Sequence, residues 1–165
     1  MSREKTKLLE KAWEYAYETE DWSPPLKMAL QDVTEEQADW RPQGAASNTI
    51  RETVHHLIYY KEKFLQKSGH KPDGITNTDT FQAAAIRAEN ASWDETRDRL
   101  AAAHAGIASI IREWSSDEDY DRELTENYTA GQWVSSLANH DAYHIGQIVL
   151  LRKLQGTWAA TRSFQ

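Results

Sequence analysis

The residues best suited to chemistry in this chain are its histidines. There are 6 of them and no cysteine, so a metal site would use His, Asp or Glu and no thiolate. His140 and His144 are one helical turn apart, and the face that they share also carries Leu137 and Ile148. Two imidazoles so spaced on a buried face can bind one cation. Two core histidines bonded to backbone or carboxylate groups fit the same spacing equally well.

A third ligand would have to come from another helix, and the neighbours His55 and His56 are the candidates. The apolar stripe of that helix centres on four residues, Ile50, Val54, Leu57 and Phe64. On the helical wheel His56 falls on the flank with Thr53, whereas His55 falls on a more polar flank with Arg51. We therefore predict that His56 points inward and that His55 is a solvated or rim residue.

Two of the remaining histidines differ in their surroundings. His104 lies within the apolar stripe of a third helix, and we interpret it as a core histidine with satisfied hydrogen bonds. The alternative is a fourth ligand or a residue that supports the ligands. His70 lies in a polar loop and gives no functional signal.

The elements that must position these residues are helices, because valines are few and no alternating strand pattern occurs. Apolar stripes predict four long helices, over about residues 4–20, 47–67, 93–114 and 129–154. Ser92 opens the third of them through a capping box, and Gly156 ends the last. Short extra helices are expected in the connections. One has Ser23 as its N-cap and the prolines of Ser23-Pro24-Pro25 in its first turn, one follows the capping box of Thr34, and one covers 81–90.

These elements predict an all-α fold, a four-helix bundle with long connections, in a single domain over residues 1–165. The long connections favour at least one crossover between helices. The polar stretch 68–80 and the acidic stretch from 115 onward are expected to be connections without strands.

Composition excludes several classes of function. The net charge is −7 and no basic cluster interrupts it, so binding to nucleic acid is not expected. No apolar run approaches about 15 residues, so neither a signal peptide nor a membrane span is expected, and a cytoplasmic protein is the default. The chain has 7 tryptophans and 7 tyrosines, more than a bundle core of this size usually needs, which favours a homodimer.

Three segments of the sequence resemble the DinB-like (DinB/YfiT-like) family of four-helix-bundle metalloproteins. They are Trp40-Arg41-Pro42 with the stretch from Thr49 to Leu57, the segment Ser92-Trp93-Asp94-Glu95, and the stretch from Asn139 to Ile148. In that family, a histidine before Leu or Ile on the second helix joins the two histidines of a His-x-x-x-His motif that precedes Gly-Gln. The resemblance implies that His56, His140 and His144 bind one divalent metal ion, for which zinc and nickel are the expected identities.

A site with three histidines leaves a position for water or for a thiolate, which is typical of catalytic metal centres. Relatives include metal-dependent hydrolases and transferases that use low-molecular-weight thiols such as bacillithiol or mycothiol. The resemblance therefore implies a metal-dependent hydrolase or thiol S-transferase that acts on a small molecule. The alternative is a non-catalytic bundle in which the metal or the histidines stabilise the fold or sense a ligand.

Four further residues are weak candidates for catalysis. Asn139 and Gln147, next to the expected ligands, would orient an imidazole or a substrate, and Tyr60 would hydrogen-bond a metal-bound group. No glutamate follows His140 to act as a general base, and Asp141 is interpreted as a group that supports the ligands or lies at the surface.

Overall fold

A computed structural model describes residues 2–44, 46–70 and 91–159. The four long helices are α1 (Glu4–Tyr17), α4 (Ile50–Lys67), α6 (Trp93–Glu113) and α8 (Ala130–Leu154). The short elements are α2 (Leu26–Ala29), α3 (Glu35–Asp39), α7 (Asp117–Asp121), β1 (Glu123–Thr125) and β2 (Tyr128–Thr129). The helix predicted over 81–90 lies outside the described residues.

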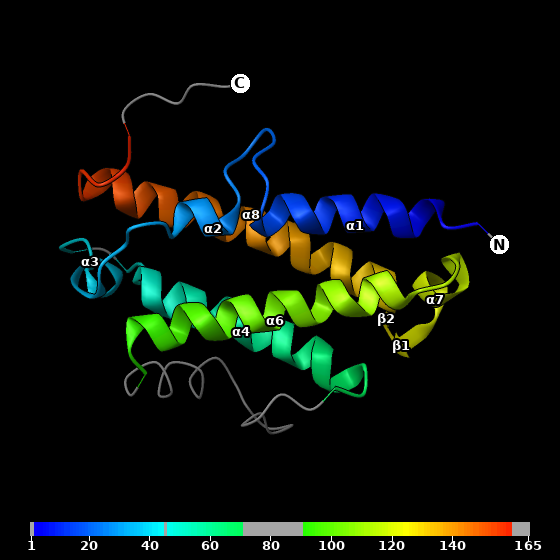
Figure 1. The fold of residues 1–165 in the computed structure, drawn as a ribbon. Coiled ribbons are helices and arrows are strands. Elements are labelled where there is room, and N and C mark those ends of the chain that lie inside the picture. Colours follow the sequence, from blue (N-terminus) through cyan, green and yellow to red (C-terminus); the bar gives the residue numbers. More distant parts are fainter. Residues whose placement is uncertain (1, 45, 71–90, 160–165) are drawn as a thin grey trace.

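The four long helices form the predicted all-α bundle. In the described residues α1 and α4 each pack against both α6 and α8, so α1 and α4 occupy opposite corners. Figure 1 shows that α4 and α6 run in the same direction, whereas α1 and α8 run the opposite way. Because two parallel neighbours cannot be joined by a tight hairpin, this arrangement confirms the expected crossover.

The core lies where the apolar stripes of the four helices meet. Every stripe residue predicted for α4 and α6 is buried, namely Ile50, Val54, Leu57, Phe64 and Leu65 on α4 and Leu100, His104, Ile107, Ile111 and, just past the helix end, Trp114 on α6. Among the described residues, no helix has the length and apolar character needed to cross a bilayer.

Capping residues set where the helices begin. Thr34, Thr49, Ser92 and Thr129 each form a capping box with the residue three positions later. The prediction that the second long helix begins near Ser47 or Asn48 was too early, because Thr49 accepts a hydrogen bond from the backbone of Glu52 and Ile50 is the first helical residue. Gly156 ends α8 with a φ of 71°, a conformation that favours glycine.

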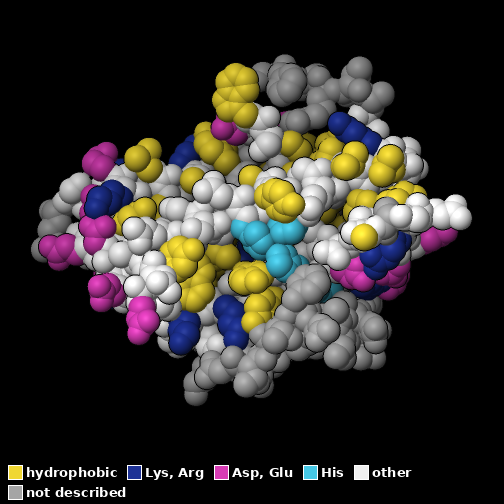
Figure 2. Space-filling view, turned by 180° about the vertical axis from the view of Figure 1, so that it is seen from behind, with side chains coloured by type: hydrophobic (Ala, Val, Ile, Leu, Met, Phe, Trp, Pro, Cys, Tyr) yellow, Lys and Arg dark blue, Asp and Glu magenta, His cyan; other side chains and the backbone are white. Residues whose placement is uncertain are grey.

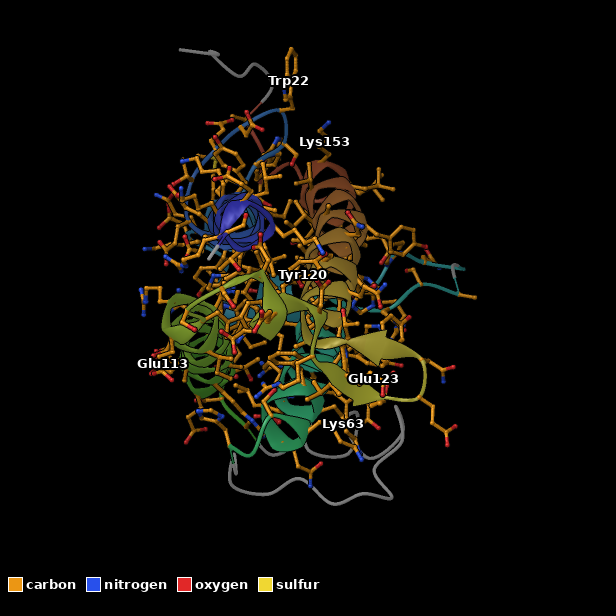
Figure 3. The ribbon with its side chains drawn as sticks, turned by 90° about the vertical axis from the view of Figure 1, so that its right-hand side faces the viewer. Trp22, Lys63, Glu113, Tyr120, Glu123 and Lys153 are labelled. Atoms are coloured by element: carbon orange, nitrogen blue, oxygen red, sulfur yellow. The ribbon has the colours of Figure 1, made fainter. Side chains whose placement is uncertain are left out.

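The first helix is shorter than predicted and the next one begins later. Helix α1 ends at Tyr17 rather than at Glu20, and α2 begins at Leu26, with Pro25 as its N-cap. Trp22 is 92% exposed and points away from the bundle (Figure 3). This stretch therefore has no large apolar side chain packed in the core, and packing is what holds most helices together in water.

A short antiparallel pair, β1 and β2, was not predicted from the sequence. Glu123 pairs with Thr129 and Thr125 with Tyr128, with an irregular register between them. Strands of 3 and 2 residues are too short to give an alternating pattern. The pair follows α7 at one end of the bundle (Figures 1 and 3) and leads directly into α8, which places Tyr128 beside Trp133.

Candidate metal centre

Three histidines from two helices meet at one point, His56 from α4 and His140 and His144 from α8. Each offers a ring nitrogen, and these nitrogens all lie within 4.8 Å of one another. His140 Nε2 is 2.9 Å from His56 Nε2 and 3.0 Å from His144 Nε2. Figure 2 shows histidine side chains at the surface of one face, among hydrophobic side chains.

The spacing of these nitrogens fits a metal ion. Zinc–nitrogen bonds of about 2.0 Å in a tetrahedron place two ligand nitrogens about 3.3 Å apart. Two of the observed separations, 2.9 and 3.0 Å, are close to this value, and the third pair of nitrogens lies within 4.8 Å, so an adjustment of the rings would make room for an ion. The cluster can therefore hold a divalent ion, with His140 and His144 stacked one turn apart and His56 facing them.

Gln147 orients one of the three rings. His144 Nδ1 donates to Gln147 Oε1 at 2.6 Å, and Gln147 Nε2 donates to the hydroxyl of Tyr143 at 3.2 Å. Because Nδ1 carries the hydrogen in this arrangement, Nε2 of a neutral His144 has its lone pair directed at the cluster. A ligand-orienting hydrogen bond of this kind is common around metal-binding histidines.

The electrostatics of the cluster favour neutral imidazoles, the form in which histidine binds metals. Burial, with a further contribution from His144, lowers the pKa of His56 to about 4. Burial, followed by repulsion from His144, His56 and Lys61, lowers the pKa of His140 to about 4. Burial also lowers the pKa of His144, although the hydrogen bond to Gln147 opposes this effect. All three rings are accordingly neutral at pH 7.

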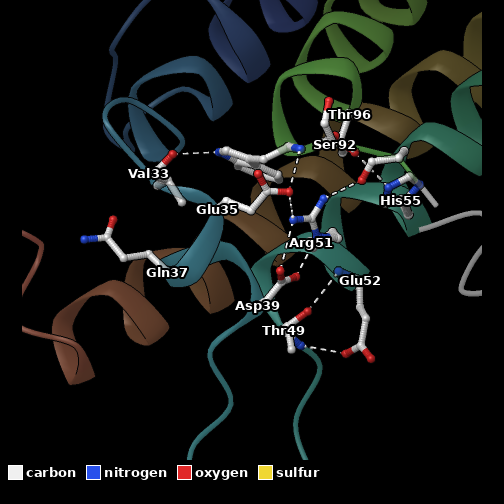
Figure 4. A network of polar contacts seen from close by, with 12 residues as sticks. Val33, Glu35, Gln37, Asp39, Thr49, Arg51, Glu52, His55, Ser92 and Thr96 are labelled. Atoms are coloured by element: carbon white, nitrogen blue, oxygen red, sulfur yellow. Dashed lines mark hydrogen bonds and ion pairs between the residues drawn. The ribbon is translucent and has the colours of Figure 1, made fainter. Parts of the chain in front are cut away.

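The prediction that His55 is a solvated or rim residue was wrong. His55 is only 4% exposed, and its Nε2 lies 3.0 Å from the hydroxyl of Thr96 on α6. Arg51 and Glu62 on the same flank of α4 are also buried, because each has partners on neighbouring elements. Arg51 binds Asp39 and Glu35 of α3 and the carbonyl of Ala91, as Figure 4 shows in part. Polarity on a helix flank therefore did not indicate exposure here.

His104 is a core residue, as predicted, but it belongs to a different part of the bundle. Its ring stacks on Trp13 at 4.5 Å and on Tyr17 at 4.4 Å, both on α1. Its Nδ1 has no hydrogen-bond partner in the described part of the chain, so the expectation of satisfied hydrogen bonds was wrong. A hollow of about 600 Å³ opens beside it, and no clustered histidine is among its described lining residues.

The weak candidates occupy different environments. Tyr60 is half-exposed and its ring meets the edges of His56 and His140, at 4.9 and 5.3 Å between ring centres. Gln147 bonds to His144, whereas Asn139 is exposed and has no hydrogen bond in the described residues. Asp141 is fully buried, so of its two predicted environments the surface one was wrong.

The partner of Asp141 was missed at the level of sequence. Lys61 on α4 donates to Asp141 Oδ1, and both side chains are fully buried. Each residue lies on the inward face of its helix, because Lys61 is four residues after the buried Leu57 and Asp141 is four residues after the buried Leu137. Two opposite charges, each on the apolar stripe of a different helix, were the available signal for a buried pair.

A pocket adjoins the cluster on the side of Tyr60. It measures about 510 Å³, and its described lining consists of Tyr60, Tyr128, Trp133, Ser136, Leu137 and His140. Among the described residues, the lining includes one member of the histidine cluster and no other ionisable group except two tyrosine hydroxyls. An aromatic and largely apolar hollow of this size, with one edge on polar ligands, is typical of sites for small molecules.

Comparisons with known proteins bear on the family. A family model described as the DinB superfamily matches residues 25–148, which include all three clustered histidines and most of the bundle. No curated protein and no solved structure matches the chain. Since the matched segment covers well over half of the sequence, the chain belongs to the DinB superfamily.

Proposed function

We propose that this protein is a metalloenzyme in which His56, His140 and His144 bind one zinc or nickel ion. Its reaction is the hydrolysis of a small molecule or the transfer of a low-molecular-weight thiol to one. The observation that carries this proposal is the position of the three imidazole nitrogens, which converge at the edge of an aromatic pocket of about 510 Å³. Three protein ligands and an adjoining pocket match catalytic sites better than structural ones, which are closed by a fourth ligand.

The chain's own residues have distinct roles in this proposal. A divalent ion held by the three neutral imidazoles would lower the pKa of a bound water or thiol and so would supply a nucleophile near neutral pH. Gln147 holds His144 in the tautomer that points Nε2 at the ion. The rings of Tyr60 and Trp133 offer apolar surface to the substrate, and the Tyr60 hydroxyl is a donor for a group at the site.

Metal content tests the ligand assignment. We expect about one zinc or nickel ion per wild-type chain after loading and dialysis, and less than about a tenth of that for His56→Ala, His140→Ala or His144→Ala. The control is His55→Gln, which alters the neighbouring histidine outside the cluster and should keep the full metal content. Loss of metal from His55→Gln together with its retention by His56→Ala would show that the ligands are misassigned.

Cobalt-loaded protein tests whether the centre is open. Its visible absorption bands should shift on addition of a thiol or of azide, because either can occupy the position that protein ligands leave vacant. A panel of ester hydrolysis and thiol conjugation assays then separates the two reactions. Bands that respond to none of these additions would replace the enzymatic interpretation with a structural or ligand-sensing one.

We propose in addition that two copies of the chain associate as a homodimer. The exposed side of α8 carries large apolar side chains that are more than half exposed, with Leu150 56% and Leu154 59% exposed. Such a stripe favours association, since burying it removes apolar surface from water. Light scattering that gives a mass of 19 kDa at high micromolar concentration would contradict a dimer.

A further inference from the structure

The strongest feature outside the histidine cluster is the contact between Lys61 and Asp141. Both side chains have zero exposure, and Lys61 Nζ donates to Asp141 Oδ1. The Lys61 ammonium also lies over the ring of Trp13 from α1, 5.4 Å from the ring centre. The ammonium is therefore held between two elements and has one carboxylate partner among the described residues.

Stability does not account well for this pair. Transferring two charges out of water costs free energy that their attraction repays only when every hydrogen bond is satisfied. Here Asp141 Oδ2 is buried and has no hydrogen-bond partner in the described part of the chain. An apolar pair of similar size would be expected to stabilise the bundle at least as well. In some helical proteins a buried polar group selects one arrangement of two helices over others.

The position of the pair indicates which arrangement it selects. Asp141 directly follows His140 and stands three residues before His144, and Lys61 stands five residues after His56. The pair thus joins the same two helices that carry the clustered histidines, within about one and a half turns of them. A slip of α8 by one residue would turn its side chains by about 100°. It would separate Asp141 from Lys61 and, at the same time, His140 and His144 from His56.

We propose that Lys61 and Asp141 are positioning residues, whose buried contact fixes the register between α4 and α8 so that His56 meets His140 and His144. The inference rests on the proposed function in one respect, because it takes the three histidines to be metal ligands. It concerns the geometry of the helices and assigns neither residue a contact with substrate.

The chain contains a matched control pair. Glu62, the neighbour of Lys61 on α4, accepts two hydrogen bonds from Arg99 at 2.6 and 2.7 Å. Arg99 belongs to α6, which carries none of the clustered histidines. Removing either pair deletes an ion pair from α4, but only the Lys61–Asp141 pair links the two helices that bear the ligands.

The test compares zinc affinity in Lys61→Met/Asp141→Leu with that in Glu62→Met/Arg99→Met. The first double variant should fold, as circular dichroism would show, and bind zinc about 10- to 100-fold more weakly than wild type, as changes beside metal ligands commonly do. The second should bind zinc within about twofold of wild type, whatever its change in stability, because no group near a ligand is altered. Equal zinc affinity in the first variant and wild type would overturn the proposal.

Two further measurements keep the inference testable if that variant does not fold or if zinc does not bind. Asp141→Glu keeps the charge but lengthens the contact by one methylene, so zinc binding should weaken by about threefold or more, whereas Glu62→Asp should leave it unchanged. In metal-free protein, nuclear Overhauser contacts between the rings of His56 and His144 should weaken in Asp141→Glu. Wild-type protein that binds no zinc contradicts the proposed function, whereas unchanged ring contacts contradict the positioning role.

Discussion

At the scale of single residues, the environment of each histidine decides what it can do. His144 has one nitrogen bonded to Gln147 and the other in the cluster, whereas His55 is bonded to Thr96 on the far flank of α4. His104 is stacked between helices α1 and α6. Only the first of these environments leaves a lone pair directed at other imidazoles, which is what a metal site requires.

Gln147→Met should weaken metal binding about 10- to 100-fold, because it removes the acceptor that fixes the tautomer and orientation of His144 while keeping a side chain of similar length. Titration with a chromophoric zinc chelator measures the change. Asn139→Ala is the control, since Asn139 is an exposed polar residue beside His140 with no hydrogen bond in the described residues. Equal weakening by both changes would show that the effect does not pass through His144.

His104 should make the folded protein less stable in acid. Burial, and then repulsion from Lys61, lowers its pKa from 6.5 to about 3. Between these two values the unfolded chain binds a proton that the folded protein does not. The stability contributed by the neutral ring is therefore complete above pH 6.5 and falls as the pH drops toward 3, by up to about 1.4 kcal/mol per pH unit.

His104→Phe keeps an aromatic ring against Trp13 and Tyr17 but removes this proton. We expect its free energy of unfolding in urea to decline less steeply than that of wild type between pH 6 and pH 4. At pH 7 the variant should be at least as stable, because the buried Nδ1 of His104 has no partner among the described residues. His70→Gln, in an exposed position, is the control. Parallel pH curves for wild type and His104→Phe would contradict the assignment.

At the scale of elements, the sequence predicts what local chemistry determines. The capping boxes of Thr34 and Ser92 and the stop at Gly156 were predictable because each involves residues a few positions apart. The burial of the apolar stripes followed from helical periodicity in the same way. The cluster of His56, His140 and His144 was also predictable. It required only the inward faces of two helices to be identified, and one of two neighbouring histidines to be chosen as the inward one.

Contacts between polar groups on different helices were not predictable in this way. The bond between His55 and Thr96 and the pair Lys61–Asp141 join residues 41 and 80 positions apart. The charges of Lys61 and Asp141 on apolar stripes indicated that a buried pair could form, but nothing local shows which residues are partners. His55 was therefore interpreted as a solvated or rim residue, when it faces Thr96 on α6. The pair β1–β2 was missed because its strands are too short for a pattern.

Two glycines of α8 should respond in opposite ways to alanine. A methyl group on Gly131 would lie 2.2 Å from the ring of Tyr120 on α7, so Gly131→Ala forces α7 away from α8 and should destabilise the protein by about 1–3 kcal/mol. A methyl group on Gly146 would meet nothing within 4 Å. Gly146→Ala should therefore stabilise α8 by up to about 1 kcal/mol, through the better helix propensity of alanine.

Urea denaturation followed by circular dichroism measures both variants. Figure 3 shows Tyr120 at the end of the bundle. The stability of Gly131→Ala therefore measures how much the packing of α7 on the start of α8 contributes at this end. Destabilisation by Gly146→Ala as large as that by Gly131→Ala would mean that glycine is needed at both positions for a reason other than the contact with Tyr120.

At the scale of the whole molecule, the bundle brings together two helices from distant parts of the chain. His56 and His140 are 84 residues apart, and the unfolded chain has no preformed site for a metal ion. Metal binding at the proposed site would therefore be linked to folding. An ion that binds only the folded protein raises its free energy of unfolding by about 2.7 kcal/mol when present at 100 times its dissociation constant.

We accordingly expect zinc to raise the unfolding temperature of wild-type protein and of His55→Gln, but not that of His144→Ala. The rise should grow with the logarithm of zinc concentration above the dissociation constant, because each tenfold increase adds about 1.4 kcal/mol. The effect should fade in acid as protons compete for the imidazoles. Since burial lowers the pKa of His56 and His140 to about 4, this competition should begin at a lower pH than for exposed histidines of pKa 6.5. Thermal unfolding scans at several zinc concentrations and pH values measure both effects, and an equal rise in His144→Ala would mean that zinc acts elsewhere on the molecule.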